Sequence, residues 1–417
     1  MARICLVTPS HLASNPRLVK EAGALQADGH EVVVIAGRYF APLDPFDEAL
    51  LETAPWRCVR VRYDRGPRVV LAKLRRRLAR RMVKMMPHPG LAVALRAHHA
   101  AIHQLADAAR RQDAGLYIGH CLAGLAAAGL ASAYTGALLG FDAEDFHPAE
   151  TEAASSDPVE IATIKRIESS FLPRCSHFTA ASPLIGEAYS TRYRVPPPIT
   201  LLNVFPLAEA PPVPVEPERP DGRALLYWFS QTIGPGRGLE ELVPALALLH
   251  QPVALRLRGL PSPGFPDALR ALALKAGFSG PIEFAPIGPP SEMVRMAAGA
   301  DLGLSLEQAH PLNRDLCLTN KIFTYLLAGV PVAMSSTRAQ RALATELGDA
   351  AILPDLSQPA RAAAALDEWL ADPTKRGAAR ASAWHSGRTR HNWDIEQHAL
   401  LSSIRQLHHA SPSPRHR

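Results

Sequence analysis

Short apolar runs alternate with amphipathic stretches in both halves of the chain. Residues 4–7 are apolar and are followed by a polar loop. Leu18, Ala22 and Leu25 then recur at helical spacing, before a second apolar run. The same order of runs restarts at residues 224–229. Strand–helix–strand repeats of this length are typical of parallel sheets with helices on both faces. The pattern therefore predicts an α/β protein with two doubly wound, Rossmann-like domains.

The chain length and one proline-rich stretch predict where these domains end. With 417 residues, the chain is too long for one ordinary core, and two domains of about 200 residues are expected. Residues 210–221 are dense in Pro and Glu and lack apolar periodicity, as in an extended linker. We predict an N-terminal domain over 1–206, a linker over 207–223, a C-terminal domain over 224–390, a final helix over 391–407 and a disordered tail over 408–417.

Composition and cysteine usage indicate a protein of a reducing compartment. Apolar residues make up 47% of the chain, and no run approaches the roughly 18 needed to span a bilayer. The apolar run at the N-terminus is too short for a secretory signal and is predicted to be a strand. The five cysteines are scattered without metal-ligand spacing, which predicts buried free thiols. We expect a cytoplasmic protein, peripheral on the inner face of a membrane if its basic segment contacts lipid.

That basic segment concentrates the positive charge of the chain. Residues 57–84 contain twelve Lys and Arg and one acid, against a net charge of +6 for the whole chain. An apolar stripe recurs at three- and four-residue steps through residues 67–86, at Leu71, Leu74, Leu78, Met82 and Met85. Three interpretations remain open: contact of residues 57–86 with an anionic membrane, a solvated face over the N-domain core, and an RNA-binding patch. No aromatic residue is interleaved in residues 67–86 to stack on bases, so nucleic acid is the weakest of the three.

Residues 300–334 combine a strand, a polar loop and a helix start. The apolar run ends on Glu307, and Lys321 lies near the opening of the following amphipathic segment. A strand that feeds a loop and a helix N-terminus presents backbone N–H groups and a positive dipole end to an anion. The stretch therefore predicts either a phosphate site at the carboxyl edge of a parallel sheet or an ordinary crossover with Thr319 as N-cap.

The segment 320–332, NKIFTYLLAGVPV, resembles the NKxFEYLxxGxPV signature of glycosyltransferases with the GT-B fold, and most closely the retaining family-4 type. This resemblance implies two domains facing a cleft and a closing helix, here 391–407, that packs back on the N-terminal domain. It also implies a metal-independent enzyme without cofactor, whose donor is a nucleotide-diphosphate sugar. The family usually has Glu where this chain has Thr324, and a hydroxyl cannot make the bidentate contact of a carboxylate to ribose.

A glycine-rich loop, 230–238, follows the first strand of the second half. Its glycines allow close backbone approach to a ligand, and Arg237 offers a fork for phosphate oxygens. The resemblance implies catalytic roles for Glu307, His120, Arg237 and Lys321. The family has a carboxylate that contacts the sugar, and we favour Glu307 for this role, with His310 as the competing residue. The donor site it implies consists of Gly234, Gly236, Arg237, Gly238, Glu307, His310, Leu318, Thr319, Asn320, Lys321 and Thr324.

Candidate acceptor contacts lie at predicted strand ends of the first half, namely His11, Asn15, His120, Asp142 and Glu144. Strand carboxyl ends are where a doubly wound sheet presents ligands, and the resemblance places the loop of His11 and Asn15 at the cleft. Two plainer alternatives stay open: an exposed loop histidine for His11, and N-capping for the acids. No metal-binding spacing is present.

Four functions follow from these patterns. The first is a glycosyltransferase that moves a sugar from a nucleotide-diphosphate donor to a glycan or lipid-linked acceptor. The absence of Glu at position 324 motivates a second, a non-catalytic scaffold of the same fold. A sugar-nucleotide epimerase of this fold is the third, and a basic RNA-binding protein through residues 57–84 is the fourth.

Overall fold

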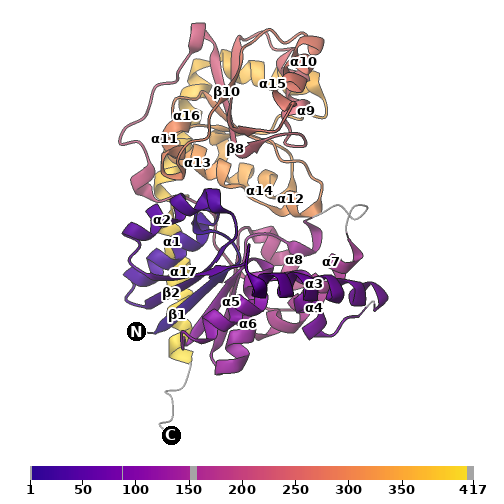
Figure 1. The fold of residues 1–417 in the computed structure, drawn as a ribbon. Coiled ribbons are helices and arrows are strands. Elements are labelled where there is room, and N and C mark those ends of the chain that lie inside the picture. The colour runs from indigo at the N-terminus through magenta and orange to yellow at the C-terminus, as the bar shows by residue number, and fades with distance from the viewer. Residues whose placement is uncertain (1, 87, 151–156, 411–417) are drawn as a thin grey trace. The chain divides into compact units, whose positions relative to one another are not determined.

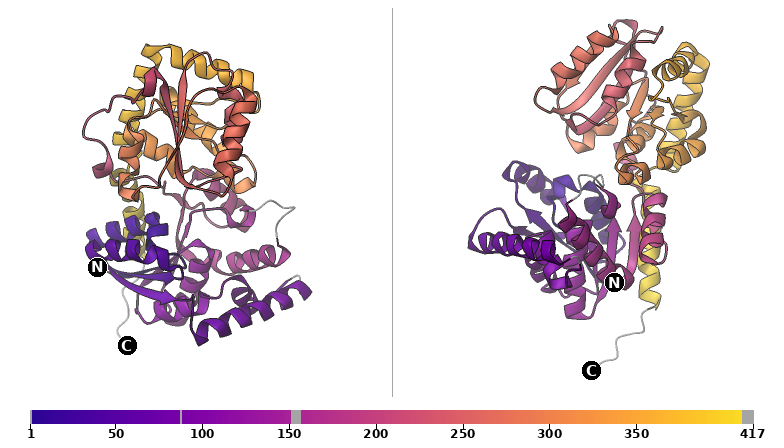
Figure 2. Two further views of the ribbon diagram at one scale, coloured as in Figure 1. Left: turned by 45° about the horizontal axis from the view of Figure 1, so that its top comes forward. Right: turned by 90° about the vertical axis from the view of Figure 1, so that its right-hand side faces the viewer.

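The chain folds into two compact α/β units, as the computed structural model describes them for residues 2–86, 88–150 and 157–410 (Figure 1). The first unit comprises Met1–Leu201 together with Gln397–Arg417, and the second comprises Leu202–Glu396. Each unit is built around its own parallel sheet, and Figure 2 shows helices on both faces of the sheets. The prediction of two doubly wound domains is confirmed.

The first unit has a seven-stranded sheet in the order β3-β2-β1-β4-β5-β6-β7, with parallel pairing throughout. Connections run outward in opposite directions from β1 and β4, so the loops after these two strands diverge at the centre of the sheet. The strands are β1 (Arg3–Thr8), β2 (Glu31–Arg38), β3 (Arg57–Arg62), β4 (Leu116–His120), β5 (Leu138–Ala143), β6 (Cys175–Ala180) and β7 (Ile199–Thr200).

Right-handed crossovers place the helices of this unit on both faces of the sheet. The predicted apolar positions of the first helix, Leu18, Ala22 and Leu25, are fully buried. The helices are α1 (Pro16–Ala27), α2 (Asp44–Thr53), α3 (Pro67–Met85), α4 (Leu91–His98), α5 (Ile102–Arg110), α6 (Cys121–Thr135), α7 (Pro158–Phe171) and α8 (Pro183–Tyr193).

The last helix, α17 (Trp393–Ala410), begins in the second unit and continues into the first. Within the first unit, Ser403 lies 3.0 Å from His177 on β6, and Arg405 forms an ion pair with Asp28. The helix starts two residues later than the predicted 391–407. It extends to Ala410, so the predicted tail is helical over 408–410, and its remainder, 411–417, lies outside the described residues.

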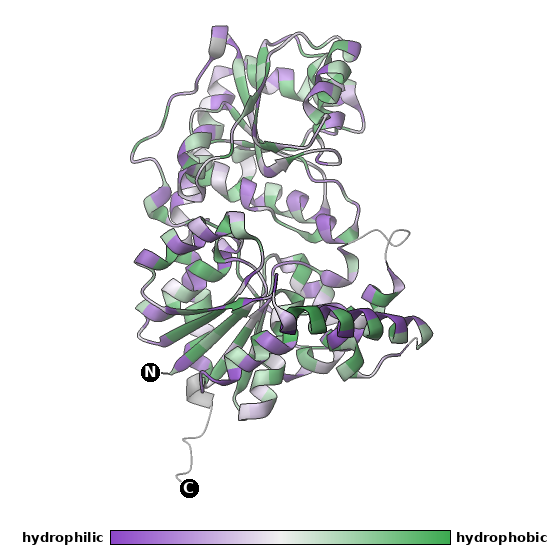
Figure 3. Ribbon diagram, in the orientation of Figure 1, coloured by the Kyte–Doolittle hydropathy of each residue, from purple (hydrophilic) through white to green (hydrophobic). Residues whose placement is uncertain are grey.

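Helix α3 does not pack through its predicted apolar stripe. Its buried positions are Val69, Ala79 and Val83, of which Ala79 and Val83 pack with residues of α4 and α7. The stripe points to solvent instead, since Leu71, Leu74, Leu78, Met82 and Met85 are all exposed. Figure 3 shows hydrophobic and hydrophilic positions side by side along this helix, whereas the central strands are mainly hydrophobic.

The second unit has a six-stranded sheet in the order β10-β9-β8-β11-β12-β13, again with parallel pairs. Its strands are β8 (Ala224–Ile233), β9 (Val253–Pro261), β10 (Ile282–Ala285), β11 (Leu302–Ser305), β12 (Val332–Met334) and β13 (Ala351–Ile352). Strand β8 continues four residues beyond the predicted end at 229, so the glycine-rich loop is shorter than predicted and covers 234–238.

Helices of the second unit surround a core formed by β8, β9, β11 and the helices packed on them. The helix that follows the glycine-rich loop ends at Leu246. The helices are α9 (Leu239–Leu246), α10 (Phe265–Ala276), α11 (Met293–Ala297), α12 (Leu312–Leu316), α13 (Asn320–Ala328), α14 (Arg338–Leu347), α15 (Pro359–Ala371) and α16 (Pro373–Thr389).

The predicted linker, 207–223, runs along the second unit and is held by hydrogen bonds. The amide of Glu218 donates to the carbonyl of Gly299 at 2.6 Å, and Arg380 donates to the carbonyl of Val215 at 2.5 Å. All five cysteines are free, as predicted, but only Cys5 is fully buried. Over the three described stretches of chain, no helix combines the length and the apolar character needed to cross a bilayer.

Candidate functional site

The candidate site of the second unit lies where the loops after β8 and β11 meet. These two strands pair in parallel, while the chain leaves them toward opposite edges of the sheet. Such a switch point is where open α/β sheets bind ligands. The loops touch at Gly238, which has φ +79°, and an added Cβ would lie 2.3 Å from the carbonyl oxygen of Leu306. Only glycine fits this position without displacing the β11 loop.

Glu307 and Lys321 form a nearly buried ion pair at this point. The Lys321 Nζ lies 2.9 Å from Glu307 Oε1, and the residues are 6% and 9% exposed. The Lys321 ammonium also lies 5.7 Å from the centre of the Trp228 ring. Burial acts to raise the pKa of Glu307, but the charges of Lys321, Arg314 and Arg237 outweigh it and hold that pKa below its ordinary value. Glu307 is therefore an ionised, buried carboxylate rather than a solvent-exposed acid at the end of the strand.

Arg314 completes a cluster of three cations around this one carboxylate. It lies on α12, and its Nη1 donates to the carbonyl of Gly236 at 2.8 Å. Arg237 follows Gly236 in the same loop and is half-buried. We name Arg237, Arg314, Lys321 and Glu307 the cationic cluster. Its formal charge is +2, so it attracts a further anion.

The N-terminus of α13 adds backbone donors beside the cluster. Thr319 occupies the N-cap position, but its side chain accepts no cap hydrogen bond and instead lies 3.1 Å from the Ser305 hydroxyl. Thr319 is therefore the N-cap residue, as the alternative of an ordinary crossover predicted, although its side chain does not cap the helix. The first N–H groups of a helix have no partner inside the helix, and here the side chain of the N-cap residue does not replace one. The helix start thus offers its donors and its positive dipole end to an anion.

The other residues predicted to bind the sugar donor differ in how accessible their side chains are to a ligand. Thr324 is fully buried, and its hydroxyl donates to the carbonyl of Asn320 at 3.0 Å, one helical turn back. His310 is exposed in the loop before α12. Gly234 and Leu318 are buried, whereas Asn320 is half-buried at the first position of α13. The hydroxyl of Thr324 is therefore occupied by its own helix rather than presented to a ligand.

His120 is the centre of the candidate site in the first unit. It ends strand β4 and is fully buried, with Nε2 lying 2.7 Å from Glu21. Its Nδ1 lies 3.3 Å from Asp142 and 3.4 Å from Glu144. Burial favours the neutral imidazole, but the three carboxylates outweigh this and raise the pKa of His120 well above its ordinary value. His120 is therefore an imidazolium paired on both sides.

Asp142 is held by a buried arginine rather than by a helix start. Arg17 donates from Nε and Nη2 to the two carboxylate oxygens at 2.6 and 2.7 Å. The third contact of Arg17, to the carbonyl of Leu201, is 2.5 Å long. Although burial acts to raise it, Arg17 and His120 hold the pKa of Asp142 far below its ordinary value. The N-capping alternative is therefore wrong for Asp142, and Glu144 is the more exposed acid of this group.

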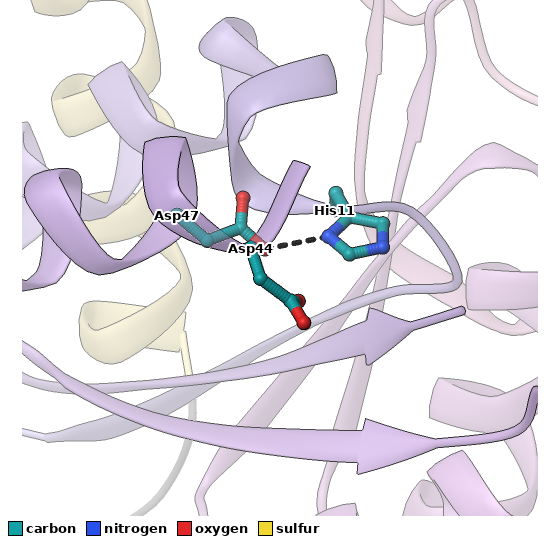
Figure 4. A group of neighbouring side chains, drawn as sticks. All are labelled: His11, Asp44 and Asp47. Carbon is teal, nitrogen blue, oxygen red and sulfur yellow. Dashed lines mark hydrogen bonds and ion pairs between the residues drawn. The ribbon is translucent and has the colours of Figure 1, made fainter. Parts of the chain in front are cut away.

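His11 and Asn15 organise the loop after β1. His11 is fully buried, and its Nδ1 donates to Asp47 at 2.7 Å (Figure 4). Its Nε2 accepts from the amides of Tyr39 and Phe40. The alternative of an exposed loop histidine is therefore wrong. Asn15 caps α1 by accepting from the amide of Leu18 at 3.0 Å. Both polar side chains thus fix the conformation of the loop.

Two groups of side chains have the spacing of metal ligands within the described residues, His11 with Asp44 and Asp47, and Glu21 with His120 and Asp142. The side chains of both groups are already engaged with one another and with arginines. In the first group, Nε2 of His11 accepts from two amides, and Arg60 and Arg38 pair with the aspartates. In the second, Glu21 and Asp142 pair with His120, and Arg17 donates to both oxygens of Asp142.

Sequence patterns missed two of these residues. Glu21 lies on α1 and was part of a helical pattern, and Arg314 lies on the short helix α12, in a stretch that was predicted to be a polar loop. The acidic and basic character of these side chains is visible in the sequence, but their role comes from contacts with residues 99 and 78 positions away, respectively. No local spacing encodes such contacts.

Solved structures with the same fold cover almost the whole chain. Searches of family models and of curated proteins found no match. HepE of Anabaena, in complex with UDP and glucose, has a TM-score of 0.70 at 14% identity, with 97% of this chain and 100% of that chain covered. Sucrose-phosphate synthase of Thermosynechococcus elongatus has a TM-score of 0.70 at 16% identity, with 99% and 100% covered. A glycosyltransferase of Rickettsia africae has a TM-score of 0.68 at 13% identity, with 98% and 99% covered.

These likenesses extend over both units, since almost the whole of this chain and of each matched chain is covered. At such low identity they establish the architecture rather than the substrates. The fold predicted from the 320–332 motif is confirmed, and the chain has the GT-B fold of these glycosyltransferases.

Proposed function

We propose that the protein is a glycosyltransferase that moves a sugar from a nucleotide-diphosphate donor to a glycan or lipid-linked acceptor. The observation that carries this proposal is the cationic cluster beside the uncapped start of α13. Arg237, Arg314 and Lys321 surround one buried carboxylate at the switch point of the second sheet. A diphosphate has the charge and the size to use all three cations and the helix N–H groups together.

The cluster suits the charge that develops during sugar transfer. As the bond between the anomeric carbon and the phosphate oxygen breaks, the nucleoside diphosphate leaves with the electron pair. Fixed cations and helix dipoles stabilise that growing charge without reorganising. The acceptor oxygen forms the new bond, and its proton passes to the departing phosphate oxygen. We propose that transfer retains the anomeric configuration and needs no metal ion, since the three cations supply the positive charge.

Donor recognition at the ribose is proposed to differ from that of the family motif. Thr324 stands where the motif has a carboxylate, and its hydroxyl is bonded to the carbonyl of Asn320. A ribose contact from this position would require that bond to break. Glu307 is the acid nearest the proposed diphosphate, and binding of a donor would release it from Lys321 toward the sugar.

Acceptor contacts are proposed for the first unit. Glu144 is the most accessible of the three carboxylates around His120, and its side chain is 27% exposed. The buried imidazolium of His120 holds the carboxylate of Glu144 in place, and it also pairs with the carboxylates of Glu21 and Asp142. Asp142 and His120 are proposed to position the acceptor loop, and Glu144 to contact an acceptor hydroxyl.

A donor screen tests the proposal. Calorimetric titration of the full chain with UDP-glucose and other nucleotide sugars should identify one donor that binds, and incubation with that donor should release nucleoside diphosphate. Arg237→Ala should weaken binding at least about ten-fold, as expected for loss of a charge-assisted contact. The control is Arg295→Ala, an exposed arginine on α11 of the same unit. Absence of any nucleotide-sugar binding would refute the proposal, and binding without turnover would support a scaffold instead.

A further inference from the structure

The exposed face of α3 carries a continuous stripe of large apolar side chains. Its members lie at steps of three and four residues, so they form one face of the helix. They are Leu71, Leu74, Leu78, Met82 and Met85, with exposed fractions from 46% to 85%. Soluble proteins seldom expose an aligned row of this kind without a partner for it.

The stripe cannot turn inward, because the opposite face of α3 is anchored. Ala79 and Val83 pack with residues of α4 and α7. Arg76 donates to the carbonyls of Ala97 and His98 at 3.3 and 3.1 Å. Arg80 forms an ion pair with Asp157, the N-cap of α7. The orientation of the helix is thus fixed by contacts that do not involve the stripe.

Basic side chains flank the stripe on both sides. At about 100° per residue, Arg75 lies on one side of it, whereas Arg77, Lys84 and Lys73 lie on the other. From Asp64 to Asp107 the sequence contains ten Lys and Arg and not one further acid. An apolar stripe between two basic edges is the pattern of a helix that lies in a lipid interface, with its charged groups reaching the headgroups.

A basic groove of about 1030 Å³ adjoins the stripe. Leu71 and Val69 of α3 line it, so the apolar and basic surfaces are continuous. Among the described residues that line the groove, the only acid is Asp107, which pairs with Arg110. Six arginines line the groove, namely Arg62, Arg65, Arg68, Arg75, Arg96 and Arg111. Guanidinium groups bind phosphate oxygens in a fork, so the groove suits lipid phosphates beside the inserted stripe.

We infer that α3 docks the protein on an anionic lipid bilayer, with the apolar stripe at the headgroup boundary and the groove arginines on lipid phosphates. Charge complementarity favours this occupant. A second copy of the chain would bring two strongly basic faces together. RNA would leave the apolar stripe unused, and no Phe, Trp or Tyr is present in residues 64–86 to stack on bases. The inference does not rest on the proposed function.

Co-sedimentation with vesicles tests the inference on the full chain. Vesicles of phosphatidylglycerol and phosphatidylcholine should bind the protein in 0.15 M salt, whereas pure phosphatidylcholine should bind it at least ten-fold more weakly. Leu74→Glu with Leu78→Glu should lower binding to anionic vesicles at least about ten-fold. The control is Leu274→Glu on α10, which replaces a leucine that is 82% exposed and should bind like the wild type.

Three single variants test the basic side chains that flank the apolar stripe. Arg75→Gln, Arg77→Gln and Arg81→Gln should each lower binding about five-fold, because each removes one cation near the lipid surface. Circular dichroism and thermal melting confirm that the variants are folded. The inference is wrong if the wild type stays in the supernatant with anionic vesicles, or if the leucine variant binds them unchanged. It is also wrong if that variant instead abolishes self-association or RNA binding, since another occupant would then cover α3.

Discussion

The ammonium of Lys321 and the carboxylate of Glu307 lie 2.9 Å apart and join the end of strand β11 to the start of helix α13. Both groups are nearly buried, so each provides the main electrostatic stabilisation of the other's charge. A diphosphate that binds Lys321 must share or replace this partner. The pair therefore holds the lysine in position before any donor arrives.

Removing one partner of this pair should destabilise the second unit. Lys321→Met leaves the Glu307 carboxylate buried without its partner, and we expect a loss of about 3–5 kcal/mol in unfolding free energy. Urea denaturation measures this loss. The double variant Lys321→Met/Glu307→Gln should recover most of the stability while donor binding stays lost. Equal stability of the single and double variants would show that the pair is not coupled.

The same pair predicts how stability changes with acid. The pKa of Glu307 is lower in the folded protein than its ordinary value of 4.5, so the pair stabilises the fold above that value. The contribution is lost as pH falls through the lowered pKa. The stability difference between wild type and Lys321→Met should therefore shrink between about pH 5 and pH 3. A difference that stays constant over this range would contradict the assignment.

Arg314 should matter for donor binding although no sequence pattern singles it out. Arg314→Ala removes the hydrogen bond to the Gly236 carbonyl and one cation near Glu307. We expect donor affinity to fall about ten-fold or more, measured by calorimetric titration. Arg314→Lys keeps the positive charge but not the forked guanidinium, so its donor affinity should fall less than that of Arg314→Ala. Arg295→Ala is the matched control, and a loss as large in that variant would indicate a general effect of charge.

Two glycines separate the cost of backbone strain from the cost of crowding. Gly238 has φ +79° and its added Cβ would meet the Leu306 carbonyl at 2.3 Å, whereas Gly277 has φ +88° and open space. Gly277→Ala should lower the free energy of unfolding by about 1–2 kcal/mol, because alanine is strained at a positive φ. Gly238→Ala should lose more and should also weaken donor binding, because the two loops must separate. Equal losses in chemical denaturation would rule out a tight contact between the loops.

His120 should make the first unit less stable in alkali. Its pKa is raised in the folded protein, so its stabilising charge is fully present below the ordinary value of 6.5 and is lost as pH rises through the raised pKa. From about pH 7 to pH 10, the melting temperature of the wild type should fall more steeply than that of His120→Gln. His391→Gln is the control, because the pKa of His391 is lowered to about 4 and its ring stays neutral over this range. Parallel slopes would contradict an imidazolium at His120.

The strand and helix order could be predicted from the sequence because it depends on local periodicity. Apolar runs such as 4–7 and 224–229 became the first strands of the two sheets, and the motif at 320–332 became helix α13 and strand β12. The orientation of α3 could not be predicted in this way. Its small residues Ala79 and Val83 allow close approach to neighbouring helices, so they are buried in place of the larger leucines.

The candidate sites were predictable only in part. Residue types at strand ends pointed to Glu307 and His120, and a lysine at a helix start pointed to Lys321. The structure places all three in buried clusters within their own units. The state of each side chain depends on distant partners, as for His11, whose ring is held by Asp47 and two amides. Thr324 shows the same limit, because its hydroxyl bonds to the preceding turn.

The division of α17 between the units has a consequence for how the protein is made. The first unit uses Ser403 and Arg405 to bind His177 and Asp28, so it is not complete when residue 201 leaves the ribosome. The second unit is contiguous over Leu202–Glu396, and every strand of its sheet is synthesised before those last contacts exist. During translation, the first unit can therefore acquire its contacts with α17 only after the second unit has been synthesised, although all seven strands of its own sheet precede residue 201.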